Sequence, residues 1–458
     1  MKKILITGDR SGSGKTSITL ALAALLAKKA TVQNFKVGMD YIDPSYLTAA
    51  SGRPCRNLDS FVLNPDQINA IFRHGCVGAD IVLVEGVRGL YEGAEALTDI
   101  GSTASVAKLL DVPVILVVSA QSITRSAAAL VKGFQSFDPE VHISGVILNN
   151  VRGGSHREKA VTAIERYCNV PVIGAIPRME EMQLAMRHLG LVPYREGSGH
   201  GDFDTKISTI TGMIGKYVDL DALHGLMKED AQPASQNKIF DDIPKPDLKI
   251  GVALDEAFNF YYADLFDILR NLGAEVVPFS PVHDRCPDAD GYIIGGGYPE
   301  LFVKELEDNL SMREAICAKS RDGVPIYAEC GGLMYLTDYI TLRKGWQSAD
   351  KDCSFGMCGV FSGETRMPGR RVVSYVEGMS KAGSPFGNAT FRGHEFHYSD
   401  VVLSAGTGYA YELSRGYGIV DGCDGAWVNN TIGSYTHLHP VASLEMFRTF
   451  LTKIRNLS

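Results

Sequence analysis

The chain lacks the long apolar run that a membrane helix requires, because none of its hydrophobic stretches approaches about 18 residues. It also lacks an excess of basic residues: 45 Lys and Arg stand against 53 Asp and Glu, which gives a formal net charge of −8. This balance argues against a general nucleic-acid or membrane-surface binder. The first apolar run meets Gly8, Asp9 and Arg10 within a few residues, so we expect a β-strand there and no signal peptide.

Cysteine motifs are missing as well. The nine cysteines form no C-x-x-C pair, and Cys353 and Cys358, which come closest to a zinc motif, lack its neighbouring ligands. An odd number of cysteines without a paired framework predicts reduced thiols and a cytoplasmic protein. Most of them are expected to pack as small buried side chains.

The sequence does contain a repeated alternation of short apolar runs and amphipathic segments. Strands are expected at residues 3–7, 81–85, 112–119 and 143–148, and helices at 17–29 and 103–110. Repeated strand–helix units predict an α/β fold with a parallel sheet and helices on both of its faces.

A polar, proline-containing stretch divides the chain. At 458 residues, the length alone suggests two or three domains. We expect a first domain at residues 1–230, a linker at 231–248 and a second domain at 249–458. Further strands expected at 249–254, 274–278, 291–295 and 324–328 make the second domain α/β as well.

The first expected strand runs directly into a glycine-rich loop, GDRSGSGKTS, which a helix follows. Such a loop can curl backbone N–H groups around a phosphate, while Lys15 reaches the outer phosphates and the Thr16 hydroxyl binds Mg²⁺. The usual G-x-x-x-x-G-K-[ST] rule would place a glycine at Asp9, whereas here it stands at Gly8. This altered loop resembles that of the dethiobiotin-synthetase-like ATPases. The predicted ATP-binding residues are Gly8, Ser11, Gly12, Ser13, Gly14, Lys15 and Thr16.

Acidic residues follow two of the other expected strands. Asp40 and Asp43 lie in the segment 36–44, which follows another likely strand, and Glu85 ends the strand expected at 81–85. The carboxyl ends of parallel strands meet at the sheet edge that also holds the phosphate loop. Because Mg²⁺ prefers oxygen ligands, Thr16, Asp40 and Glu85 are metal candidates, and Asp40 and Asp43 are substrate candidates. Helix caps or surface carboxylates are the alternative for each acid taken singly.

Asn149 follows another expected strand. In related ATPases an asparagine at this place contacts the adenine, so Asn149 joins the predicted nucleotide site. A simple asparagine-containing turn is the alternative.

One cysteine differs from the others. Cys330 ends an expected strand, two glycines follow it, and a helix comes next, which is a nucleophile elbow with a thiol. The N–H of Gly331 can face a developing oxyanion, and a second donor can come from the glycines at 295–297. A thiol nucleophile needs a base, and His437 and His439 are both candidates. A buried cysteine in a tight turn is the alternative.

With these motifs the chain resembles the cobyrinate a,c-diamide synthase family, in which an ATP-dependent amidoligase is fused to a class I glutamine amidotransferase of the cobyric-acid type. The resemblance covers nearly the whole chain, most specifically residues 36–44, 52–59, 84–93, 124–131, 257–262, 295–301, 329–336, 393–399 and 434–439. It implies a P-loop (dethiobiotin-synthetase-like) parallel-sheet domain followed by an amidotransferase α/β domain.

The resemblance also implies roles for residues of the second domain. Cys330 matches the nucleophile that releases ammonia from L-glutamine. His437 matches the activating histidine, with His439 in reserve, and Gly297 and Gly331 match the backbone of the oxyanion hole. The family shows no obvious third acid beside the cysteine and the histidine, so none is named.

The implied reaction is amidation of the a and c acetate carboxylates of a tetrapyrrole through an acyl phosphate, with ATP, Mg²⁺ and glutamine. Two segments, GVRGLYEG at 86–93 and SAQSITR at 119–125, depart from the common family text and look more like the methanogen branch, which amidates nickel sirohydrochlorin. One alternative is a cobyrinate-only enzyme of cobalamin biosynthesis. A more distant one is a regulatory P-loop ATPase with an inactive amidotransferase-like domain.

A substrate covered in carboxylates needs basic residues around it, although the chain is acidic overall. Arg53, Arg56, Arg88 and Arg125 are expected in loops near the ATP site, and Arg56 and Arg88 are the substrate candidates among them. Surface solvation is the alternative for any one of them. The expected partner is the tetrapyrrole, with no nucleic acid or membrane, and a homodimer is one assembly that the sequence allows.

Overall fold

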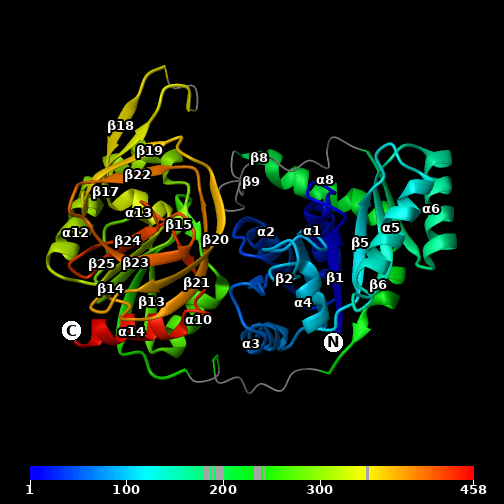
Figure 1. The fold of residues 1–458 in the computed structure, drawn as a ribbon, viewed down its shortest axis with the longest axis horizontal. Helices are drawn as coiled ribbons and strands as arrows, with labels where there is room; N and C mark the ends of the chain where they lie inside the picture. The colour runs from blue at the N-terminus through cyan, green and yellow to red at the C-terminus, as the bar shows by residue number, and fades with distance from the viewer. Residues whose placement is uncertain are drawn as a thin grey trace. The chain divides into compact units, whose positions relative to one another are not determined.

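The computed structural model describes residues 1–178, 186–187, 190–191, 201–231, 239–240, 243–346 and 350–457. The chain divides into two compact units, Met1–Asn237 and Lys238–Ser458, and each is described by itself (Figure 1). Much of the linker expected at 231–248 lies outside the described residues, because 232–238 and 241–242 are not among them. The linker and the domain limits derived from it stay predictions.

A parallel sheet forms the centre of the first unit. Its strand order is β3-β2-β4-β1-β5-β6-β7, and the short β10 pairs antiparallel with β1. Because β1 lies between β4 and β5, the segments that leave the carboxyl ends of β1, β2 and β4 meet at one sheet edge. The strands are β1 Lys2–Gly8, β2 Val32–Val37, β3 Arg56–Leu58, β4 Ile81–Gly89, β5 Val114–Ser119, β6 Ile143–Val151, β7 Val172–Pro177 and β10 Lys228–Glu229, with a separate pair β8 Met186–Arg187 and β9 Gly190–Leu191.

Helices cover this sheet, as the apolar strands require. Strand β5 is buried along its whole length, which is typical of a strand covered on both faces. Helix α1 packs against α2 and α8, and α5 packs against α6 (Figure 1). The helices are α1 Lys15–Leu26, α2 Ile42–Ser51, α3 Pro65–Cys76, α4 Thr103–Leu109, α5 Arg125–Phe137, α6 Gly154–Cys168, α8 Gly201–Tyr217 and α9 Leu220–Leu226. The predicted α/β fold is confirmed for this unit.

A ten-stranded mixed sheet forms the centre of the second unit. Its order is β13-β11-β14-β16-β25-β24-β23-β20-β21-β26. The first five strands pair in parallel and the rest pair antiparallel. The strands are β11 Leu248–Ala253, β13 Ala274–Phe279, β14 Gly291–Ile294, β16 Ile326–Glu329, β20 Val372–Ser380, β21 Thr390–His397, β23 Gly408–Arg415, β24 Cys423–Val428, β25 Thr431–Ser434 and β26 His437–Leu438. The four strands predicted in this unit are confirmed.

Smaller elements complete the second unit. A four-stranded sheet has the order β18-β17-β19-β22, and β12 pairs antiparallel with β15. These strands are β12 Phe258–Phe260, β15 Gly296–Gly297, β17 Thr337–Leu342, β18 Cys353–Gly356, β19 Phe361–Met367 and β22 Asp400–Leu403. The helices are α10 Ala263–Asn271, the 3₁₀ turn η2 Pro299–Leu301, α11 Val303–Asp308, α12 Leu310–Arg321, α13 Gly331–Leu336 and α14 Leu444–Arg455.

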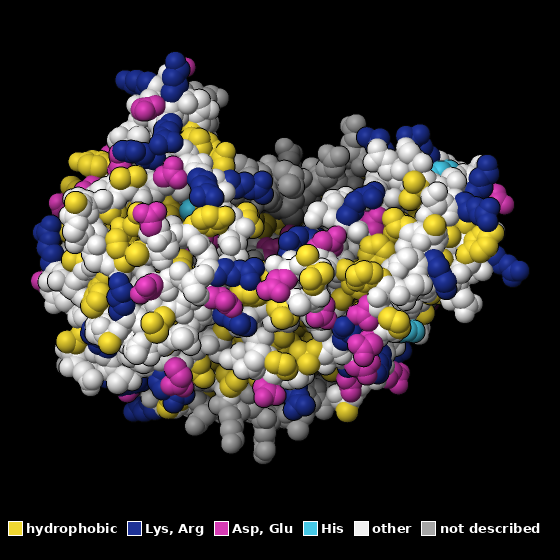
Figure 2. Space-filling view, viewed as in Figure 1, with side chains coloured by type: hydrophobic (Ala, Val, Ile, Leu, Met, Phe, Trp, Pro, Cys, Tyr) yellow, Lys and Arg dark blue, Asp and Glu magenta, His cyan; other side chains and the backbone are white. Residues whose placement is uncertain are grey.

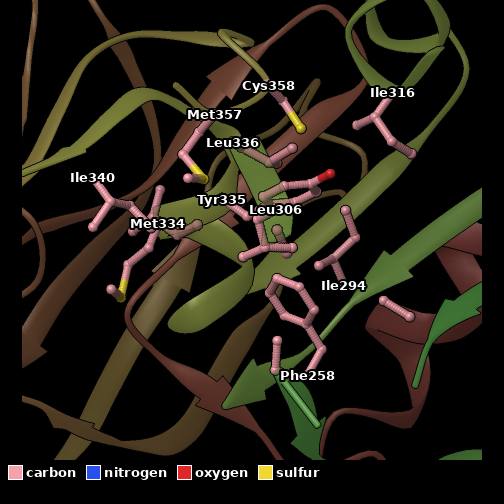
Figure 3. Close-up of a cluster of buried hydrophobic side chains, with 14 of the residues drawn as sticks. Phe258, Ile294, Leu306, Ile316, Met334, Tyr335, Leu336, Ile340, Met357 and Cys358 are labelled. Atoms are coloured by element: carbon pink, nitrogen blue, oxygen red, sulfur yellow. The ribbon is translucent and has the colours of Figure 1, made fainter. Parts of the chain in front are cut away.

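The core of the second unit anchors the turn that carries Cys330. Met334, Tyr335 and Leu336 of α13 lie in one buried cluster with Phe258 and Ile294 (Figure 3). Burying side chains of this size stabilises the fold by about 1.5–3 kcal/mol each. The short helix after the cysteine is therefore held by its apolar side chains, and the backbone of the turn is held with it.

The surface carries charges of both signs. On the faces seen in Figure 2, Lys and Arg are interspersed with Asp and Glu, so the net charge of −8 is an average over a mixed surface. Within the described ranges, no helix has the length and apolarity that crossing a membrane would require.

Candidate functional sites

The phosphate loop joins β1 to α1, and it is tightly packed at its end, Gly14. Gly14 has a φ of 94°, and a Cβ atom there would lie 2.2 Å from Nδ2 of Asn149. The same Nδ2 donates a hydrogen bond of 2.9 Å to the Ser13 carbonyl, so Asn149 holds the loop from β6, two strands away from β1 in the sheet. Ser11 and Gly12 are exposed at the tip of the loop. The loop thus leads directly into the N-terminus of α1, an arrangement that binds phosphate.

A hydroxyl and two carboxylates meet beside this loop. Thr16 Oγ1 donates to Glu85 Oε1 at 2.9 Å and lies 3.3 Å from Asp43 Oδ2. Glu85 Oε2 is buried and has no hydrogen-bond partner among the described residues. A buried carboxylate oxygen without a donor suits a cation, and oxygen donors of this kind suit Mg²⁺. Thr16, Glu85 and Asp43 therefore fit the metal.

The predicted metal candidate Asp40 is placed differently from the other two acids. Its Oδ1 accepts hydrogen bonds from the backbone N–H groups of Ile42 and Asp43, at 2.8 and 3.2 Å, and so caps the start of α2. In the described part of the chain, no three acidic, histidine or cysteine side chains are arranged to hold a metal by themselves. Mg²⁺ beside a phosphate loop commonly takes oxygen ligands from the phosphates of the nucleotide as well as from carboxylates.

A lysine outside the predicted site residues lies at the centre of this cluster. Lys36 Nζ in β2 lies 2.6 Å from Asp43 Oδ2, 2.9 Å from Glu85 Oε1 and 3.8 Å from Asp40 Oδ2. Its side chain is 1% exposed. Burial alone would lower the pKa of Lys36, but the charges of Asp43 and Glu85 raise it above the ordinary value, so the ammonium persists. The sequence feature that could have indicated this role is a lysine inside an otherwise buried strand.

The charges of the cluster set one another's protonation. Burial raises the pKa of Glu85, and that effect exceeds the opposing effect of Lys36. Burial also acts to raise the pKa of Asp43, but the two lysines outweigh it and lower that pKa to about 2. Burial and the Asp43 charge raise the pKa of Asp40. Burial and the nearby Lys36 charge lower the pKa of Lys15.

The prediction that four arginines lie in loops near the ATP site is wrong for three of them. Arg56 lies in β3 and is buried, and Arg88 lies near the end of β4 with a φ of 49° and is exposed. Arg125 is the first residue of α5, where its guanidinium contacts Tyr167. Strands β3 and β4 include residues that had been assigned to loops, because sheet pairing extends past the apolar runs. Only Arg53 lies outside helices and strands. The substrate roles of Arg56 and Arg88 stay predictions.

In the second unit, Cys330 lies on a sharp turn between β16 and α13. Its φ of 46° and ψ of −98° are strained for a residue with a side chain, and it is 5% exposed. A Cβ atom on Gly332 would lie 2.1 Å from the Ile294 carbonyl oxygen, so the next turn of chain requires glycine. The predicted elbow of strand, cysteine and helix is confirmed.

The segment after β14 lies against this elbow. A Cβ atom on Gly331 would lie 3.0 Å from the backbone N of Gly297. Gly297 itself has a φ of 154°, and a Cβ atom there would meet the Ala257 carbonyl oxygen at 2.0 Å. The structure therefore brings the backbones of Gly297 and Gly331 together, and only glycine fits at Gly297.

The two candidate histidines have different partners in the structure. Burial lowers the pKa of His437, but hydrogen bonds with the Cys330 thiol and the Glu329 carboxylate outweigh it and raise the pKa to about 10. His439 instead places Nε2 3.6 Å from Asp264 Oδ2, and its ring lies 4.8 Å from that of Tyr262. His437 is thus the histidine at the thiol.

A second residue absent from the predicted site completes this arrangement. Glu329 immediately precedes the cysteine, and its Oε2 lies 3.2 Å from Nδ1 of His437. Its Oε1 accepts hydrogen bonds from the backbone N–H of Leu438, at 3.0 Å, and from the Tyr327 hydroxyl. The family resemblance offered no third acid, and the adjacency of Glu329 to Cys330 was the signal that could have indicated one.

Two known protein families match the two parts of the chain that carry these sites. Residues 4–192, which contain the phosphate loop, match the CobQ/CobB/MinD/ParA nucleotide binding domain. Residues 249–443, which contain Cys330 and His437, match the CobB/CobQ-like glutamine amidotransferase domain. A protein of Methanosarcina barkeri named cobyrinate a,c-diamide synthase is 48% identical, over 99% of this chain and 96% of that protein.

The chain belongs to the cobyrinate a,c-diamide synthase family. Another member, from Methanosarcina acetivorans, is 49% identical over 97% of this chain and 93% of its own length. A member from Methanothermobacter thermautotrophicus is 43% identical over 98% and 99%. The predicted order of a nucleotide-binding domain followed by a glutamine amidotransferase domain is confirmed by these family matches.

Proposed function

We propose that this chain is an ATP- and glutamine-dependent ligase that converts the a and c acetate carboxylates of a tetrapyrrole to amides. The observation that carries the proposal is the presence on one chain of a phosphate loop beside an acidic cluster and of a strained cysteine beside His437. The first arrangement suits the activation of a carboxylate, and the second suits the release of ammonia. The names of the relatives supply the a and c positions.

In the first half of the reaction, ATP phosphorylates the substrate carboxylate to an acyl phosphate and leaves as ADP. A free carboxylate is a poor acyl donor, and the acyl phosphate gives it a good leaving group. Lys15 stabilises the charge on the transferred phosphoryl group, and the loop from Gly8 to Thr16 binds the phosphates. Thr16, Glu85 and Asp43 would hold Mg²⁺, which would neutralise phosphate charge. Lys36 keeps the acids in place before the nucleotide binds.

In the second half, Cys330 releases ammonia from glutamine. Nε2 of His437, whose raised pKa favours the imidazolium, takes the thiol proton, and sulfur attacks the side-chain amide carbon as the thiolate. The Gly297 and Gly331 N–H groups stabilise the oxyanion. His437 then gives the proton to the leaving ammonia, and water hydrolyses the thioester to glutamate and free thiol. Ammonia attacks the acyl phosphate and displaces phosphate, so each amide consumes one ATP and one glutamine.

We infer that the tetrapyrrole is nickel sirohydrochlorin, with cobyrinate as the competing substrate. The two segments at 86–93 and 119–125 support the methanogen branch, and the relatives compared above come from methanogens. Exposed Arg88 is the first candidate to contact the substrate. Asp40 and Asp43, which follow a strand of the same sheet, are the next candidates. Both tetrapyrroles should be supplied together with ATP, Mg²⁺ and glutamine. The mass change of hydroxyl to amino at each carboxylate shows which one is amidated first.

Two substitutions test the division of labour. Cys330→Ser should abolish amidation from glutamine and keep amidation from ammonium salts, because only ammonia release needs the thiol. Lys15→Ala should abolish amidation from either nitrogen source, because both need the acyl phosphate. Glutamine-driven turnover in Cys330→Ser, or normal turnover in Lys15→Ala, would contradict the proposal.

We also propose a cellular location and partners for the enzyme. All nine cysteines are free thiols, which supports a reducing cytoplasm. The reaction requires neither nucleic acid nor a membrane as a partner. A homodimer is one assembly under which both reactions could proceed.

A further inference from the structure

We propose that Glu329 is the positioning residue that orients His437, so that the nucleophile and the acid of the glutaminase site are consecutive residues of the chain. The proposal rests on the proposed glutamine hydrolysis and deepens it. It supplies the third member that the family resemblance left unassigned.

The contacts of the Glu329 carboxylate define one orientation of the imidazole. Oε1 is held by the Leu438 N–H and the Tyr327 hydroxyl, which leaves Oε2 facing Nδ1 of His437 at 3.2 Å. A carboxylate at Nδ1 requires the proton on that nitrogen, so Nε2 is the atom that accepts the proton of the thiol. The Glu329 side chain is 10% exposed and that of His437 is 1% exposed, so water does not compete for this contact.

The backbone explains how neighbouring side chains meet one ring. Successive residues of a strand point to opposite faces, which would separate Glu329 from Cys330. The φ of 46° at Cys330 breaks that alternation. The backbone before His437 is held as well. Asp424 accepts hydrogen bonds from the backbone N–H groups of Tyr435 and Thr436, the two residues that precede His437.

The Glu329 carboxylate is the acid at hydrogen-bonding distance from the ring. His394 stacks on His437 at 4.9 Å, but burial and the charges of the neighbouring histidines hold its pKa well below the ordinary value, so it is neutral. Glu395 is occupied by the backbone N–H groups of Tyr417 and Gly418. The titratable side chains whose charge acts with that of His437 are Glu329, Cys330, His394, Glu395 and His397.

The test is Glu329→Gln in the full chain, with glutamine hydrolysis as the assay. A glutamine amide would present N–H groups to Nδ1 and favour the tautomer that cannot accept the thiol proton. We expect kcat to fall by about 10²- to 10⁴-fold, with KM for glutamine within about threefold of its original value. Amidation from ammonium salts should be retained. Glu329→Asp, which keeps the carboxylate, should recover part of the loss.

Tyr327→Phe is the matched control, because it removes one donor to Oε1 and leaves the contact with His437. The second readout is the pH profile of kcat/KM. Since the carboxylate helps to raise the pKa of His437, its removal should move the basic limb to lower pH. A merely structural role would leave that limb in place.

Unchanged glutamine hydrolysis in Glu329→Gln would overturn the inference. The inference would also be overturned if Tyr327→Phe lost as much glutamine hydrolysis as Glu329→Gln and the basic limb of Glu329→Gln stayed in place. Failure of the proposed function is distinguishable, because it would appear as glutamine-driven amidation in Cys330→Ser, whatever the result at Glu329.

Discussion

The two sites of this chain are prepared for their chemistry in different ways. In the first unit, charge prepares the site: Lys36 is buried between Asp43 and Glu85, and the hydroxyl of Thr16 completes the cluster. In the second unit, the backbone prepares it: Cys330 is strained, and Gly332 has no room for a side chain. The stability of the first site should therefore be sensitive to a change of charge, and the backbone of the cysteine turn in the second to a change of volume.

The largest expected effect is at Lys36. Lys36→Met keeps much of the side-chain length but leaves buried Asp43 and Glu85 without their cation. Breaking a buried pair in this way costs about 3–5 kcal/mol. We expect the free energy of unfolding in denaturant to fall by that amount at neutral pH, together with loss of ATP-dependent amidation.

The pH dependence of this loss has a defined sign. In the unchanged protein the pKa of Asp43 is held at about 2, so its stabilising contribution is present above its ordinary value and is lost only as the pH falls through 2. Without Lys36, burial raises that pKa, and protonation relieves the cost. The deficit should therefore narrow as the pH is lowered. The double variant Lys36→Met/Asp43→Asn should be less destabilised than Lys36→Met, and an equal or larger loss would contradict the charge argument.

The second effect is at Gly332. A Cβ atom there would meet the Ile294 carbonyl oxygen at 2.1 Å, so Gly332→Ala forces the elbow to shift. We expect a loss of about 1–3 kcal/mol in unfolding free energy and a large fall in glutamine hydrolysis, with ammonia-driven amidation retained. Gly408→Ala is the matched control in the same unit, since its nearest atom is 3.5 Å away. If both variants behaved alike, the backbone argument would fail.

The smallest effect is at Asn149, where a single hydrogen bond holds the phosphate loop. Asn149→Ala should weaken ATP binding by about tenfold, because a hydrogen bond is worth roughly 0.5–1.5 kcal/mol. Titration with ATP and with GTP separates the two roles of this residue. Equal weakening of both nucleotides indicates support of the loop, and a changed preference between them indicates contact with the adenine.

The sequence was sufficient to predict the elements whose signals are local. The apolar runs, the GSGKT loop and the ECGG turn each appear within a few consecutive residues, and the structure has a strand or a turn at each of them. The antiparallel half of the ten-stranded sheet was not predicted, because strands such as β20 and β23 have mixed burial and short-range patterns that resemble loops.

The residues that sequence reasoning missed act through partners far away in the chain. Lys36 meets Glu85 across 49 positions, and Glu329 meets His437 across 108. Both residues lie in segments that the sequence singles out, but nothing in those segments indicates the distant partner, so only the fold shows what each contacts. The choice of His437 over His439 had the same origin, since the two differ in spatial neighbours and hardly in sequence context.

The central claim is that one chain activates a carboxylate with ATP and supplies it with nitrogen from glutamine. The most direct measurement uses a tetrapyrrole labelled with oxygen-18 in its carboxylates and glutamine labelled with nitrogen-15 in its side-chain amide. We predict that each amide formed carries nitrogen-15 and that one oxygen-18 appears in inorganic phosphate. Oxygen-18 in AMP, or an amide without nitrogen-15, would contradict the account.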